Sequence, residues 1–138
     1  MLRNVPLLIV PFILFNIGIA GLFGTDAVGG MIDPWAGSLL TVTMVSGGIF
    51  ALDWGTALVT LSLLLLFVEL VKSTRTSNAS VVDHILSIFV FVAFLVEFLL
   101  VRSAAHPVFF LLMVIALVDV LAGFSVSLRA AGRDVNWN

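Results

Sequence analysis

The sequence predicts an all-α membrane protein, a bundle of four transmembrane helices with a short β-hairpin between the first and second helices. The first observation is composition: 62% of the 138 residues are hydrophobic, 10% are charged and the mean hydropathy is +1.27. Soluble domains are about 45–50% apolar and about 25% charged. The second observation is that four apolar stretches approach the roughly 20 residues that span a bilayer. We therefore predict one integral membrane domain over residues 1–138, with the lipid bilayer as its main partner.

The four predicted helices cover approximately residues 5–23, 54–71, 81–101 and 107–128. The first could be mistaken for a signal peptide, but Pro6 and Pro11 interrupt it and no clean small-residue cleavage site follows, so we interpret it as an uncleaved helix. The third opens near Ser80 with a sequence that resembles a capping box. The fourth opens with Pro107, whose missing N–H costs nothing at the first helical position.

The segment between the first two helices predicts a β-hairpin over approximately residues 38–53. Two runs rich in β-branched residues surround Ser46-Gly47-Gly48, a pattern typical of two strands joined by a tight turn. With a period of two, Thr41 and Thr43 share one face of this hairpin. The opposite face then carries Leu40, Val42 and Met44. A re-entrant helix over residues 36–52 is the alternative that the sequence leaves open.

Basic residues near the helix ends predict the orientation. Five of them fall on one side of the four-helix arrangement: Arg3, Lys72, Arg75, Arg129 and Arg133. Arg102 falls on the other side, with the hairpin segment, which has acidic residues but no basic ones. We therefore expect a multi-pass protein with both termini cytoplasmic and an extracytoplasmic hairpin. Trp35, Trp54 and Trp137 are expected at the membrane boundaries.

Polar residues inside the predicted spans are the candidates for a functional role. Glu69, Glu97 and Asp119 are carboxylates in apolar stretches, and Asn16 is a polar residue in the first helix. A charge at the centre of a bilayer costs roughly 2.5–3.5 kcal/mol even on lenient insertion scales. The three carboxylates could therefore form a ladder across the membrane, as proton relays do, or they could be neutralised by local partners.

Local partners are available for two of the three carboxylates. Glu69 lies three residues before Lys72, and Glu97 lies five residues before Arg102, so each could pair with its basic neighbour. Asp119 has no basic neighbour in its own helix. We expect it to be protonated or hydrogen-bonded to a facing helix, with Asn16 as one possible partner.

Small residues on two helices predict close helix packing. In the fourth helix the stripe consists of Ala116, Gly123 and Ser127, on the same face as Asp119. In the first helix it consists of Ala20 and Gly24, in line with Asn16. These contacts can lie within the chain or between subunits, so a homo-oligomer and a membrane-protein partner both remain open.

The sequence does not favour an enzyme. It has no cysteine, no metalloprotease or nucleophile-elbow motif and no glycine-rich phosphate loop. The two histidines, His84 and His106, fall at opposite membrane faces, so they cannot share a metal ion. We expect no catalytic residue, no cofactor, no metal site and no nucleic-acid partner.

Two runs of the sequence carry a resemblance to known proteins. The first extends from Leu64 to His84 and contains Glu69, Lys72, Arg75 and Asp83, and the second extends from Phe109 to Phe124 around Asp119. In these runs the chain resembles small, uncharacterised proteobacterial inner-membrane proteins of similar length. The resemblance implies a bacterial inner membrane and a four-helix layout, and it brings no established activity. Lys72, Arg75, Asp83 and His84 would then lie in or beside a cytoplasmic loop.

Two functions remain in view. The first is a small accessory or scaffolding protein that associates through helix packing with itself or with a larger membrane complex. The alternative is a small oligomeric ion channel or proton-coupled transporter that uses the intramembrane carboxylates.

Overall fold

The computed structural model describes residues 5–19, 35–73 and 78–135, and within these ranges the side chains of residues 73–81 and 126–135 fall outside the description. The described chain is mostly helical. The elements in chain order are α1 (Ile9–Ile19), β1 (Ser38–Thr43), β2 (Ile49–Asp53), α2 (Trp54–Ser73), α3 (Asn78–Leu100), the short 3-10 helix η2 (Arg102–Ala104) and α4 (Pro107–Val135).

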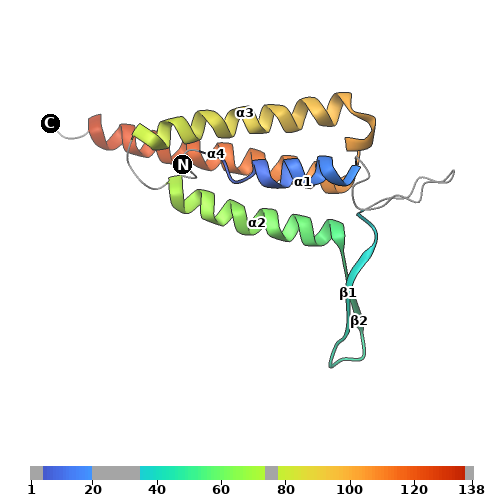
Figure 1. The fold of residues 1–138 in the computed structure, drawn as a ribbon. Coiled ribbons are helices and arrows are strands. Elements are labelled where there is room, and N and C mark those ends of the chain that lie inside the picture. The colour runs from blue at the N-terminus through green and yellow to red at the C-terminus, as the bar shows by residue number, and fades with distance from the viewer. Residues whose placement is uncertain (1–4, 20–34, 74–77, 136–138) are drawn as a thin grey trace.

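The helices α2, α3 and α4 run side by side, with α4 between the other two and the shorter α1 lying against them (Figure 1). Two glycines allow the close approaches. A Cβ at Gly55 of α2 would lie 2.7 Å from the Val108 side chain of α4, and a Cβ at Gly123 of α4 would lie 2.6 Å from His84 Nδ1 of α3. The last helix of the chain is therefore the central one.

The first helix differs from its prediction. It begins at Ile9 rather than near residue 5, and the described helix has 11 residues. Pro6 restricts the residue before it and cannot donate a helical hydrogen bond, so the chain enters through a turn in which Ile9 N–H bonds to Pro6 C=O at 3.2 Å. Pro11 lies in the first turn, where a missing N–H is tolerated. At about 1.5 Å per residue, α1 is about 16 Å long, short of a span. Residues 20–23 lie outside the described chain.

The other three helices confirm their predictions in type and place, with different ends. Within α2, α3 and α4, the segments Trp54–Lys72, Val82–Leu100 and Pro107–Ser125 are long and apolar enough to cross a membrane. The third helix starts at Asn78, before the predicted cap at Ser80. The fourth helix extends past its predicted end near residue 128 to Val135, because the more polar residues after 128 are also compatible with a helix.

The hairpin prediction is confirmed and the re-entrant helix is wrong. β1 and β2 pair antiparallel, with Val42 opposite Phe50 and Thr43 opposite Ile49. Gly47 has φ +86° and follows two turn residues, so it occupies the left-handed position that a three-residue hairpin loop requires. The Met44 N–H closes this loop on Gly48 C=O at 2.7 Å.

The core of the bundle is aromatic. Phe15, Phe94 and Phe109 are fully buried, and the centroid of the Phe109 ring lies 4.8 Å from that of Phe15 and 5.2 Å from that of Phe94. Trp35 stacks on Phe15 at 5.2 Å and is itself buried, so it packs in the core of the bundle. Trp54 is half exposed at the start of α2.

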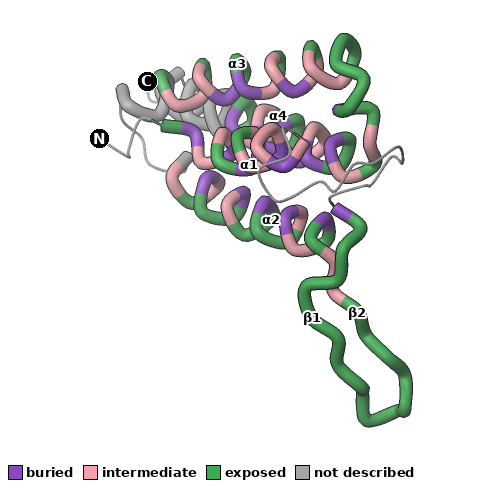
Figure 2. The backbone as a smooth tube through the Cα atoms, turned by 45° about the vertical axis from the view of Figure 1, so that its right-hand side comes forward, coloured by how far each residue is buried: buried purple, intermediate pink, exposed green. Residues whose placement is uncertain are grey.

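The outside of the bundle is apolar. Exposed side chains alternate with partly buried ones along α2, α3 and α4, and most of the exposed ones are Leu, Val, Ile or Phe (Figure 2). In a soluble protein such an extended apolar surface would be unusual, since exposed apolar patches on monomers rarely exceed a few hundred Å². The surface therefore suits an apolar surrounding, as the composition predicts.

Candidate functional site

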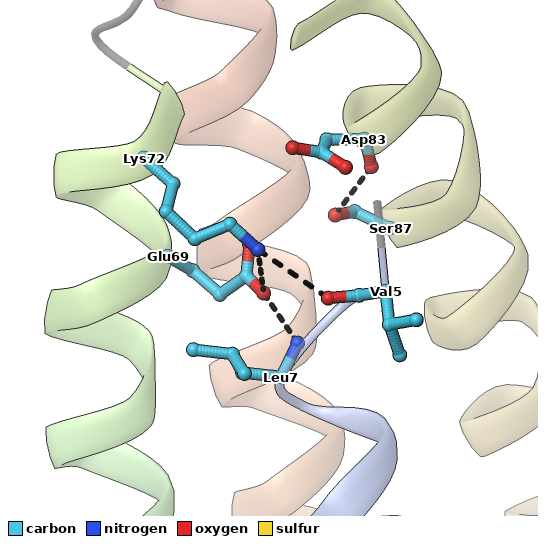
Figure 3. Close-up of polar contacts among 6 residues, drawn as sticks. All are labelled: Val5, Leu7, Glu69, Lys72, Asp83 and Ser87. Carbon is cyan, nitrogen blue, oxygen red and sulfur yellow. Dashed lines mark hydrogen bonds and ion pairs between the residues drawn. The ribbon is translucent and has the colours of Figure 1, made fainter. Parts of the chain in front are cut away.

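The first polar cluster joins the end of α2 to the chain that enters α1. Glu69 is only 4% exposed and forms an ion pair with Lys72 at 3.7 Å, as the sequence predicts. The Glu69 carboxylate also accepts the backbone N–H of Leu7, and the Lys72 ammonium donates to Val5 C=O at 3.4 Å (Figure 3). The pair thus holds two backbone groups on either side of Pro6. A carboxylate beside a helix N-terminus is stabilised by the free N–H groups and by the helix dipole.

Asp119 of α4 extends this first cluster toward α3. It is 5% exposed and lies beside the Ser87 side chain of α3, close enough to Glu69, Lys72 and Asp83 to interact with their charges. Asp119 thus faces a polar side chain of a neighbouring helix, and that side chain is Ser87, whereas Asn16 bonds Glu97. The Ser87 hydroxyl donates to Asp83 C=O at 2.9 Å, one turn earlier on α3 (Figure 3).

Two more polar atoms border the first cluster. Asp83 Oδ1 and His84 Nδ1 are buried, and neither has a hydrogen-bond partner among the described residues. His84 packs on Gly123, and its ring lies 6.5 Å from that of Phe124. Asp83 and His84 were predicted beside the cytoplasmic loop, within the start of the third helix, and both lie in the second turn of α3, which begins at Asn78.

The second polar cluster is a single bridge between α1 and α3. Asn16 Nδ2 donates to Glu97 Oε2 at 3.1 Å and to Phe12 C=O at 2.8 Å. Both N–H groups of the Asn16 amide therefore have acceptors. Among the described side chains no ion pair joins Glu97 to Arg102, and the Glu97 carboxylate accepts a hydrogen bond from Asn16 instead. Arg102 lies in η2, where the chain has already left the helical direction of α3.

The three carboxylates do not form a continuous ladder along the described bundle. Glu69 and Asp119 belong to one cluster, and Glu97 belongs to the other. Between them lie Phe94, Leu112 and Ile115, all buried and all apolar. Carboxylates separated by packed hydrocarbon cannot pass a proton directly, since a relay needs ionisable groups or water at successive depths.

The predicted packing stripe of the fourth helix is an internal contact. Ala116 is buried and Gly123 lies against His84 of α3, so this face of α4 is already covered by the same chain. The Ser127 side chain lies outside the described residues, as do Ala20, Gly24 and Arg75. Ala116 and Gly123 are therefore not available for a contact with another protein.

Two further polar residues, Ser62 and His106, form hydrogen bonds close to their own positions in the chain. The Ser62 hydroxyl is fully buried and donates to Leu58 C=O at 2.7 Å, one turn earlier in α2. His106 accepts the Val108 N–H on its Nδ1 at 3.0 Å and so caps α4. No group of three or more potential ligands among the described residues could hold a metal ion. The chemistry of both clusters is therefore hydrogen bonding and charge pairing between helices.

Comparisons with family models, with curated proteins and with solved structures found no match for this sequence. The resemblance to small inner-membrane proteins thus stays a prediction, and functional reasoning depends on the geometry.

Proposed function

We propose that this protein is a small integral membrane accessory or scaffolding protein, without catalytic activity, that associates through helix packing with itself or with a larger membrane complex. The observation that carries the proposal is a row of exposed apolar side chains along α3. The row consists of Ile85, Phe89, Val92, Val96 and Leu99. Its members recur at alternating four- and three-residue spacing, which is the spacing of helices that pack side by side as coiled coils do.

The helix α3 is also the least covered of the three long helices. Only 11% of its apolar span is buried within the chain, against 28% for α2 and 33% for α4. The two polar clusters, by contrast, have partners inside the chain. An assembly surface on α3 therefore leaves the internal contacts of the bundle untouched.

Membrane placement is part of the same proposal. The three long apolar helices would cross the inner (plasma) membrane of a bacterium, with Lys72 near the cytoplasmic surface and Arg102 near the opposite one. The C-terminus would then be cytoplasmic and the hairpin extracytoplasmic, and the N-terminus would also be cytoplasmic, because Val5 lies beside Lys72. Reporter fusions after Asn138 and at Gly48 should report the cytoplasm and the outside respectively. Reporting from the same side would contradict this topology.

The assembly surface can be tested by cysteine cross-linking, because the chain has no cysteine of its own. Phe89→Cys places a thiol in the α3 row, and Leu64→Cys places a matched control on the exposed face of α2. After mild oxidation in native membranes, the proposal expects covalent products from position 89 and few from position 64. The intact complex, purified in a gentle detergent, should then show by mass whether the product is a second copy or another protein. A monomer without cross-links at position 89 would refute the proposal.

A channel or proton-coupled transporter is the second candidate, and the burial of Asp119 beside Glu69 is the observation in its favour. The packed hydrocarbon between the clusters weighs against a route through the bundle. Asp119→Asn distinguishes the two functions, since its amide retains a donor toward Ser87 but cannot exchange a proton. A scaffold should keep its yield of intact complex in this variant, and wild-type liposomes should show no proton flux. Flux in the wild type that Asp119→Asn abolishes, at normal yield, would establish the transporter instead.

A further inference from the structure

The hairpin has one apolar face and one face that carries hydroxyl groups. The register sets Leu40 opposite Leu52 and Val42 opposite Phe50, so these four side chains share a face. The other face carries Thr41 opposite Ala51, and Thr43 opposite Ile49. The Ser38 and Thr41 hydroxyl groups lie 3.1 Å apart. The hairpin is therefore amphipathic, although residues 38–52 contain no charged side chain.

Along most of its length the hairpin packs against none of the residues that the structure describes. Its strands project away from the bundle across the direction of the helices, and both are exposed from the turn to near the start of α2 (Figures 1 and 2). Leu40, Val42 and Phe50 are each about half exposed. An isolated two-stranded hairpin is at best marginally stable in water, so a partner surface would stabilise it.

The attachment of the hairpin fixes its level relative to the helices. β2 ends at Asp53 and α2 begins at Trp54, without an intervening loop. Where β1 begins, Gly37 C=O accepts the Trp54 N–H at 3.0 Å. Because the helices would cross the bilayer, a ribbon that leaves the end of α2 sideways runs along the membrane surface. Trp54 at this junction is the residue type that favours the interface.

The free edges of the two strands limit how deep the hairpin can lie. Each edge presents backbone N–H and C=O groups that pair with no other strand in the described part of the chain. Such groups are not tolerated in the hydrocarbon region, where nothing can bond them. At the headgroup level, water and lipid oxygens can satisfy them. An uncharged amphipathic ribbon at this level suits a lipid surface, with its apolar face toward the acyl chains.

We propose that the hairpin is an interfacial membrane anchor that lies on the lipid headgroup region, with Leu40, Val42, Phe50 and Leu52 facing the acyl chains and Thr41 and Thr43 facing water. The partner is the lipid surface itself. This inference rests on the membrane placement proposed above and adds a contact outside the transmembrane helices. It also gives the apolar hairpin face a function that helix packing alone does not require.

Single-cysteine labelling can test the anchor on the full chain. Four variants, Val42→Cys, Thr43→Cys, Phe50→Cys and the α2 reference Leu64→Cys, are labelled with an environment-sensitive fluorophore. They are then reconstituted into vesicles of phosphatidylcholine and phosphatidylglycerol. Quenching by acyl-chain-brominated lipid reports contact with lipid, and quenching by iodide reports contact with water. Labels at positions 42 and 50 should lose fluorescence to brominated lipid, as position 64 does, since Leu64 is exposed on α2 and lies outside the α3 row. The label at position 43 should be quenched mainly by iodide.

The outcomes separate the anchor from its rivals. If position 64 is quenched by lipid while positions 42 and 50 are quenched by iodide as strongly as position 43, the hairpin lies in water and the anchor is refuted. If the shielding of positions 42 and 50 is lost when the protein is diluted into more lipid, a second copy covers the face instead. If position 64 also fails to contact lipid, both the membrane placement and the anchor are refuted. Shielding of positions 42 and 50 that persists on dilution supports the anchor.

Discussion

Replacement of Glu69 should release the start of α1 from the bundle. The carboxylate accepts the Leu7 N–H and pairs with Lys72, which in turn holds Val5 C=O. Glu69→Leu removes the acceptor, leaves the Leu7 N–H without this partner and leaves Lys72 without its counter-ion. Glu69→Gln keeps an oxygen of nearly the same position as an acceptor and removes only the charge. The two variants therefore separate the hydrogen bond from the ion pair.

The size of the effect follows from the surroundings. Hydrogen bonds to charged groups contribute about 1.5–3 kcal/mol in soluble proteins, and interhelical hydrogen bonds in membranes contribute about 0.6–1.7 kcal/mol. For a carboxylate that is 4% exposed we expect Glu69→Leu to cost about 2 kcal/mol, which is roughly a 30-fold change in a local opening equilibrium. Lys72 is 22% exposed, so loss of its ion pair alone in Glu69→Gln should cost about 0.5 kcal/mol, or roughly twofold.

Amide hydrogen exchange of residues 7–12 measures this opening directly. Exchange should accelerate strongly in Glu69→Leu and slightly in Glu69→Gln, while amides in the middle of α4 stay protected in both. Lys72→Met should resemble Glu69→Gln, since it removes the same ion pair. Unchanged exchange in Glu69→Leu, or equal acceleration in both Glu69 variants, would refute this reasoning. In either case the hydrogen bond from the Leu7 N–H to Glu69 would not be the main contact that holds the start of α1.

Three further predictions concern local geometry. Gly47→Ala should destabilise the hairpin by about 1–2 kcal/mol, because a Cβ is strained at positive φ; amide exchange in β1 would report this, and unchanged protection would contradict it. Gly18→Ala should displace the Trp35 ring that its Cβ would overlap and cost about 1–3 kcal/mol, with a shift in Trp fluorescence. Hydrogen bonds from the side chain and backbone N–H of Thr56 hold the pKa of Asp53 below its ordinary value near 3.8, so the stabilisation that Asp53→Ala removes is present at neutral pH and disappears as the pH falls through this lowered pKa. The difference in unfolding free energy between wild type and Asp53→Ala should therefore shrink as the pH falls. A difference that stays constant across acidic pH would contradict this prediction.

Much of the fold could be predicted because it depends on local signals. Apolar length identifies α2, α3 and α4, and Pro107 marks where α4 begins. The hairpin follows from strand-like runs on either side of a Gly-containing turn. The length of α1 could not be predicted in the same way, since hydropathy continues smoothly across Pro6 while the backbone turns there.

The partners of the polar residues were harder to predict than the residues themselves. The Glu69–Lys72 pair was accessible because both residues lie on one helix face, three positions apart. The bond from Asn16 to Glu97 and the approach of Asp119 to Ser87 join different helices, and their pairing depends on how the helices rotate and slide against each other. Sequence spacing contains no such information. A long α3 row at alternating four- and three-residue spacing was visible in the sequence, but it could not be assigned to the outside without the packing.

The central place of α4 bears on the order of synthesis. Translation delivers the N-terminal elements first, so α2 and α3 emerge before the helix that lies between them. Until α4 arrives, Ser87 lacks the Asp119 carboxyl, His84 lacks the Gly123 surface, and Gly55 of α2 has no neighbour to approach. At that stage α2 and α3 carry groups whose neighbours on α4 have not yet been synthesised. The bundle can therefore pack fully only after α4 has been synthesised. A chain that stalls before Pro107 lacks the helix that joins α2 to α3, and we expect such a chain to be degraded.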